Sequence, residues 1–176
     1  MKKLVILALL ALELAVCGCG SSNSSTTTTP TSASGNWEAQ LTGGTGDAAL
    51  LNFVSTFTVN NNGPLSITAF SFFNAGKCFV SGQTESGSAT LTTDSTNHVT
   101  GTFNYTVQSG SPSGNTLTLD GSLTGTSTTG TSGSTPTLTG GAVEGTWTLT
   151  GGAGDSTCTG SGSFIMCQNA TTCSIT

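Results

Sequence analysis

The 176-residue chain is poor in charge: three lysines, no arginine and eight acidic side chains give a formal net charge of −5 at pH 7. So few cations cannot neutralise a phosphate backbone or attract anionic headgroups, which excludes nucleic-acid binding and electrostatic binding to membranes. Abundant Gly, Ser and Thr would fit a disordered chain, but the alternation of apolar and polar residues described below predicts a folded β domain.

The first residues have the layout of a secretory signal peptide. Met1–Lys3 is basic, Leu4–Leu12 is apolar without interruption, and small residues follow. The apolar run is shorter than the roughly 20 residues that a membrane-spanning helix needs. We therefore expect residues 1–18 to be removed from the mature protein.

A cysteine motif follows the apolar run. Val16-Cys17-Gly18-Cys19 resembles the motif at which bacterial lipoprotein precursors are cut and lipidated. The resemblance implies that Cys19 carries the acyl chains, palmitate among them, and anchors the protein to a membrane of the cell envelope. Gly20 after this cysteine resembles lipoproteins sent to the outer membrane. A cut before Cys17 fits the motif less well, because Val16 would then precede the cut.

The count of cysteines supports lipidation of Cys19. Removal of Cys17 and lipidation of Cys19 leave four cysteines, an even number suited to two disulfides: Cys78, Cys158, Cys167 and Cys173. Cys167 and Cys173 bracket a plausible turn, so we expect them to pair with each other and Cys78 to pair with Cys158. A bond from Cys158 to Cys173 is the alternative. The cysteine spacing does not fit a zinc site, and we expect no metal or cofactor.

The mature chain divides into two parts. Residues 19–34 contain the lipidated cysteine and a Ser/Thr-rich tether without the apolar residues that a core needs. Residues 35–176 are predicted to form a single all-β domain. A second Ser/Thr-rich stretch, Thr126–Thr137, is predicted to be a loop.

The predicted strands begin with Trp37–Leu41, which alternates apolar and polar residues. Residues 51–59 then place Leu51, Phe53, Phe57 and Val59 on one face, and Asn60–Pro64 is a turn signal. Along residues 65–72 the alternation changes phase, from Leu and Ile to Phe at positions 70 and 72. This change predicts either a β-bulge or a strand buried on both faces.

The same period of two continues through Val99–Val107 and Leu117–Leu123. Strands joined by short turns favour an antiparallel meander, closed as a β-barrel or stacked as a β-sandwich. Gly101, Gly121 and Gly125 fall on the predicted inward face, where glycine permits bends and close approach of the backbone.

Two segments repeat one pattern. Gly35–Asp47 and Gly145–Asp155 both contain G-x-W followed by L-T-G-G-x-G-D. If the sheet closes, the repeat predicts that Trp37 and Trp147 lie close together at one end of the core, each indole N–H bonded to a backbone carbonyl. Exposed tryptophans that bind a ligand such as a sugar are the alternative.

The first of these units also resembles a known family. Gly35-Asn36-Trp37 is similar to the G-x-W of the first lipocalin strand, in a family of β-barrels that bind small apolar ligands. The arginine that packs on this tryptophan in lipocalins is absent here. The resemblance therefore implies a barrel, and it suggests a carrier of a small apolar ligand as an alternative function.

Catalytic chemistry has little support in the sequence. His98 is the only histidine, no G-x-S-x-G motif is present, and each glycine-rich loop offers one carboxylate, fewer than calcium sites gather. We expect tight hairpins at these loops and a turn around His98. The sequence thus favours a non-enzymatic envelope lipoprotein with a structural or binding β domain, over a lipocalin-like carrier and over an envelope hydrolase.

Overall fold

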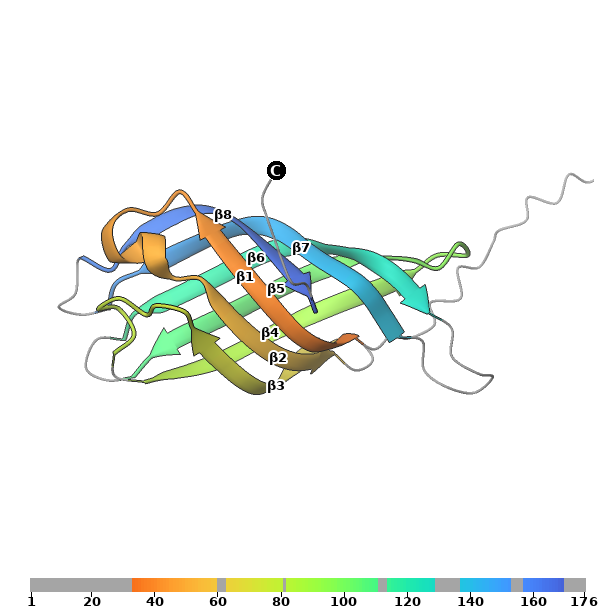
Figure 1. Cartoon of the computed structure of the whole chain (residues 1–176), viewed down its shortest axis with the longest axis horizontal. Helices are drawn as coiled ribbons and strands as arrows, with labels where there is room; N and C mark the ends of the chain where they lie inside the picture. The colour runs from red at the N-terminus through yellow and green to blue at the C-terminus, as the bar shows by residue number, and fades with distance from the viewer. Residues whose placement is uncertain are drawn as a thin grey trace, which may run out of the picture.

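The computed structural model describes residues 33–59, 63–80, 82–110, 114–128, 137–152 and 157–169. The chain forms a closed antiparallel barrel whose strands follow one another around the wall in sequence order (Figure 1). The strands are β1 (Ala33–Thr42), β2 (Phe53–Val59), β3 (Gly63–Phe72), β4 (Gln83–Thr93), β5 (His98–Ser109), β6 (Thr116–Thr128), β7 (Thr137–Thr150) and β8 (Gly160–Gln168). A 3-10 helix, η1 (Gly46–Leu50), follows β1. The all-β prediction is confirmed, and of its two forms the barrel is the one observed.

Three element boundaries differ from the prediction. β1 begins at Ala33, before the expected domain start at residue 35. β6 continues to Thr128, so the first residues of the expected loop belong to a strand. The connection after β1 is η1 rather than a tight hairpin, because residues 43–52 are too many for one and coil into a helical turn.

The alternation in the sequence sets which residues face inward. In β2, Phe53, Phe57 and Val59 are buried as predicted, Ser55 shares their buried face, and Val54, Thr56 and Thr58 on the other face are more exposed. The inward position of Gly121 is also confirmed. A Cβ there would lie 3.0 Å from Cζ of Phe164, so glycine leaves room for that ring.

The change of phase in β3 is a β-bulge. Thr56 pairs with Ala69 whereas Phe57 pairs with Ile67, so Thr68 is the extra residue of β3. The alternative of a strand buried on both faces is wrong, because every residue of β3 is at least partly exposed.

The barrel wall is weakest between β3 and β4. These strands pair only at Gly63↔Ala89 and Pro64↔Ser88, whereas β4 and β5 pair from Gln83↔Ser109 to Thr93↔Val99. Closure on the other side is extensive, with β1 paired to β8 from Trp37↔Gln168 to Thr42↔Ser163. The edges of β3 and β4 that face each other are therefore mostly without a neighbouring strand.

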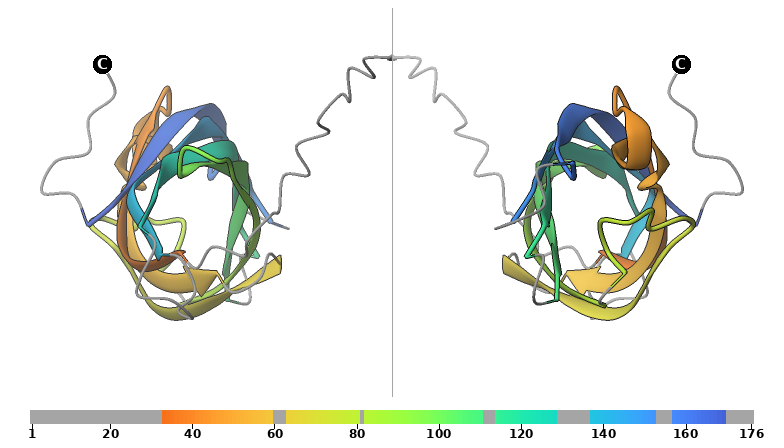
Figure 2. Two further views of the ribbon diagram at one scale, coloured as in Figure 1. Left: turned by 90° about the vertical axis from the view of Figure 1, so that its right-hand side faces the viewer. Right: turned by 90° about the vertical axis from the view of Figure 1, so that its left-hand side faces the viewer.

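The two ends of the barrel differ (Figure 2). β1 starts at one end and leads into η1 at the other, where the segment after β3 also lies: the N–H of Phe73 donates to the carbonyl of Asn52 at 2.9 Å. We name η1 together with residues 73–80 the cap. The chain thus enters the barrel at the end opposite the cap.

Candidate functional site

Aromatic rings fill the middle of the barrel. Phe57 stacks on Trp37 with ring centroids 5.2 Å apart, and Phe53 lies 4.9 Å from Phe70 and 5.6 Å from Tyr105. The cluster draws on four strands: Trp37, Phe53, Phe57, Phe70, Phe72, Phe103 and Tyr105. This part of the interior is packed core rather than a ligand chamber.

Both tryptophans belong to the core. Trp37 and Trp147 have no exposed surface, so the alternative of exposed, ligand-binding indoles is wrong. A large apolar area is buried at each position, which gives both residues a structural role.

The expectation that the two indoles share one end of the core is wrong. Trp37 pairs with Gln168 of β8, and Trp147 pairs with Gly162 of the same strand. Six residues of β8 separate these levels, about 20 Å at the usual rise of a strand. β8 also lies between β1 and β7, and the stagger of strands in a barrel displaces the two repeated segments along its axis.

The two indole N–H groups differ in their bonding. Nε1 of Trp147 donates to the carbonyl of Thr42 at 2.9 Å, as expected. Nε1 of Trp37 is buried and has no hydrogen-bond partner among the residues that the structure describes. The predicted carbonyl partner is thus present for Trp147 only.

A buried hydroxyl pair lies beside the aromatic cluster. The hydroxyls of Ser55 and Tyr105 are 2.8 Å apart, and Ser55 also donates to the carbonyl of Ala69 at 3.2 Å. Burial raises the pKa of Tyr105 strongly, the hydrogen bond between its hydroxyl and Ser55 acts in the opposite direction, and the nearby carboxyl of Glu85 adds to the increase. The phenol of Tyr105 therefore stays neutral, and its role is in the packing of the core.

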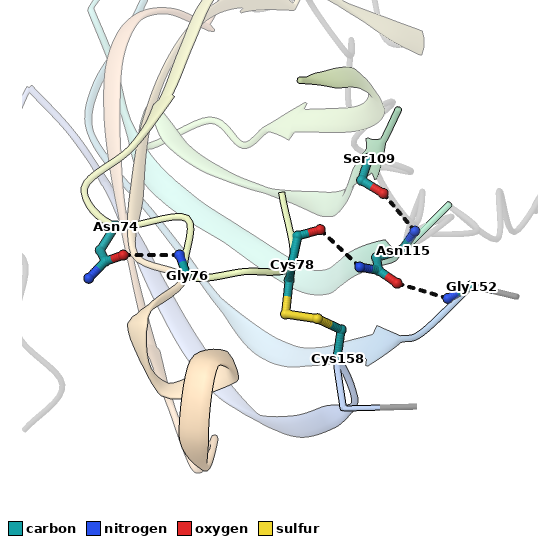
Figure 3. The surroundings of a disulfide bond; sticks show 7 residues. All are labelled: Asn74, Gly76, Cys78, Ser109, Asn115, Gly152 and Cys158. Carbon is teal, nitrogen blue, oxygen red and sulfur yellow. Dashed lines mark hydrogen bonds between the residues drawn. A yellow bond between two sulfur atoms is a disulfide. The ribbon is translucent and has the colours of Figure 1, made fainter. Parts of the chain in front are cut away.

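The cap is tied down by a disulfide and an asparagine (Figure 3). Cys78 and Cys158 form a disulfide between buried positions whose Cα atoms are 5.6 Å apart, as predicted. Nδ2 of the fully buried Asn115 donates to the carbonyl of Cys78 at 2.9 Å, and its Oδ1 accepts from the N–H of Gly152 at 2.9 Å. The side chain of Asn115 thereby links three loops: the one before β6, the one between β3 and β4, and the one between β7 and β8. No sequence pattern predicted this role.

The remaining cysteines are only partly described. Cys167, in β8, is disulfide-bonded. Its predicted partner Cys173 lies outside the described residues, as do Cys17 and the expected lipidation site Cys19.

Two surface features remain available for contacts. The cap carries exposed apolar side chains, with Leu50 42%, Phe73 61% and Val80 75% exposed. On the outer side of β1–β3, beside the bulge, an open hollow of about 310 Å³ is lined by Asn36, Val54, Ser55, Thr56, Ala69, Phe70 and Ser71. No charged side chain lines it, so it suits a small neutral group.

His98 and its neighbours form a turn. His98 is exposed at the start of β5, as predicted. Oδ1 of Asp94 accepts from the backbone N–H groups of Thr96 and His98 at 2.8 and 3.0 Å, and from the Thr96 hydroxyl at 2.7 Å. These hydrogen bonds, the Thr96 hydroxyl first among them, lower the pKa of the Asp94 carboxyl. The arrangement is that of a structural turn.

Comparison with known proteins gives no relative. No family model, no curated protein and no solved structure matches the chain. Within the described ranges, no three His, Cys, Asp or Glu side chains gather as metal ligands. The same ranges contain no helix long and apolar enough to cross a membrane.

Proposed function

We propose that the chain is a lipoprotein anchored by Cys19 to a membrane of the cell envelope, the outer membrane where a cell has two, and that its barrel is a non-enzymatic structural or binding module. The packed interior of the barrel is the observation that supports a structural or binding module over a carrier of an apolar ligand. Rings from four strands occupy the space in which a carrier would hold an apolar ligand. Contacts with other molecules then fall to the outer wall and the cap.

The direction of β1 supports this arrangement. A tether that joins the barrel at Ala33 enters at the end opposite the cap, and β1 spans ten residues, about 33 Å. The exposed side chains of Leu50, Phe73 and Val80 therefore lie at the end of the barrel away from the start of β1. The outer hollow beside the bulge lies on the side wall, where neutral groups can reach it.

Fractionation of cells tests the anchor. Cys19→Ser should release the protein from membranes, because no acyl chain then holds it, whereas the matched change Cys17→Ser should leave it bound. The opposite result would reverse the assignment of the lipidated cysteine. A lipid that co-purifies with the barrel of the Cys19→Ser protein would contradict the non-carrier function separately.

A further inference from the structure

The outer edge of β3 is an unprotected strand edge. Beyond Pro64, β3 has no strand partner on the β4 side, so residues 65–72 present backbone N–H and C=O groups along that edge. Natural proteins usually guard such edges with charged side chains. β3 has no charged residue, and its only guards are Pro64, in the short paired part, and the bulge at Thr68.

The facing edge of β4 is guarded. Glu85 lies on the inward-facing side of β4, and an inward charge is a known device against strand addition. Continued along the two strands, the register of the Gly63↔Ala89 and Pro64↔Ser88 pairs brings Glu85 opposite Ile67, where β3 is no longer paired. Any added strand will therefore follow the edge of β3.

The side chains of β3 favour a neutral partner with small outward residues. On the inward side, Leu65, Ile67, Phe70 and Phe72 are only partly buried against the core. On the outward side, the exposed residues are small or hydroxylated: Ser66, Thr68, Ala69 and Ser71. Across an antiparallel pair, Ser and Thr side chains attract one another, and no like charges meet.

We propose that β3 is the interface through which two copies of this chain associate, β3 pairing antiparallel with β3 of the second copy. Such an interface is self-complementary about a twofold axis, because each copy offers the same neutral edge. The rest of the chain is net negative, so the neutral strand is where two copies approach with least repulsion. A strand from an acidic partner would instead meet the carboxyl of Glu85.

Light scattering of the purified full chain in a mild non-ionic detergent tests the proposal. The wild type should form dimers in the micromolar range, more tightly as salt screens the net charge. Ser66→Lys places a cation on the exposed outward face of β3 in each copy, away from the bulge, and should raise the dissociation constant by about tenfold or more. Thr102→Lys is the matched control: Thr102 is also exposed, but it pairs with Thr90 and Ser122 on both sides, and its dimer should be unchanged.

Hydrogen exchange gives a second measurement that does not depend on the variants. Amides of residues 65–72 should exchange more slowly at high than at low concentration of wild-type protein, while those of β5 should not change. A wild type that stays monomeric, or a dimer unaffected by Ser66→Lys, would overturn the proposal. The monomeric result would leave the edge of β3 to a strand from another protein.

Discussion

At the scale of single residues, polar atoms in the barrel interior define how the core is built. The neutral hydroxyl pair of Ser55 and Tyr105 lies among phenylalanine rings, and its hydrogen bond offsets the cost of burying both groups. The indoles of Trp37 and Trp147 are equally buried but unequally bonded. Each of these differences can be measured.

Tyr105 is the only tyrosine, so its ionisation can be followed by absorbance. In the unfolded chain a phenol titrates near pH 10, and burial raises the pKa of Tyr105 in the folded state. The neutral phenol thus contributes stability that is fully present below about pH 10 and is lost as the pH rises toward the folded-state pKa. We expect no phenolate signal until the protein unfolds, and a smaller alkaline loss of stability in Tyr105→Phe. Phenolate formation near pH 10 in the folded protein would contradict this.

The two tryptophans provide a matched pair of substitutions. Trp147→Phe removes a donor and leaves the carbonyl of Thr42 without it, whereas Trp37→Phe removes an N–H that has no partner in the described structure. Both changes cost some packing, but we expect Trp147→Phe to lower the free energy of unfolding by about 1–2 kcal/mol more. Urea unfolding of both variants measures the difference. Equal losses, or a larger loss at Trp37, would show that the hydrogen bond to Thr42 contributes little.

At the scale of elements, the cap depends on links that are distant in sequence. The disulfide joins the segment after β3 to the segment before β8, with 80 residues between the cysteines. Asn115 adds hydrogen bonds to Cys78 and Gly152 around the same point. The cap is therefore fixed both by a covalent bond to the segment before β8 and by a hydrogen bond from the segment before β6.

Removal of the disulfide should cost about 4 kcal/mol, the chain-entropy value for a loop of this length. The double variant Cys78→Ser, Cys158→Ser should show this loss in urea unfolding, and either single variant should show a similar loss because both break the bond. The far-ultraviolet circular dichroism should persist, since the barrel ladders are intact. A loss below about 1 kcal/mol would mean that the hydrogen bonds of Asn115 hold the cap without the bond.

Elements with a side-chain pattern could be predicted, and those without one could not. Alternation identified the faces of β2, and the phase change from Ile67 to Phe70 indicated the bulge, because burial imposes period two on a strand. The extension of β6 through Thr126–Thr128 was missed, since Thr and Ser in a strand resemble a loop. The repeated G-x-W segments were real strands, but their offset along the barrel depends on stagger, which no local pattern encodes.

The candidate contact surfaces were harder still to predict. The apolar side chains of the cap become neighbours only through tertiary contacts such as that between Phe73 and Asn52. Asn115 lies between Gly and Thr in a stretch that reads as an ordinary turn, yet it is fully buried. The long-range disulfide was the exception, because an even cysteine count leaves few pairings to choose from.

At the scale of the whole molecule, the barrel has one firmly tied end and one loosely joined wall. The cap is fixed by covalent and hydrogen bonds, whereas the gap between β3 and β4 relies on two residue pairs. The start of β1 at Ala33 and the exposed apolar groups of the cap lie at opposite ends of the barrel. In the proposed anchored form, the molecule would be attached at one end and would leave the side wall and the cap available for contacts.

The pairing of β1 with β8 also governs the order of events when the protein is made. The N–H of Asn169 donates to the carbonyl of Asn36, across 133 positions of sequence, so the first strand has no second neighbour until almost the entire chain is available. In a chain synthesised from its N-terminus, β1 therefore has no β8 to pair with until the seven later strands have been made. Contacts of such long range place the protein among the slow folders, at milliseconds to seconds, and its half-built sheet has exposed edges for all of that time.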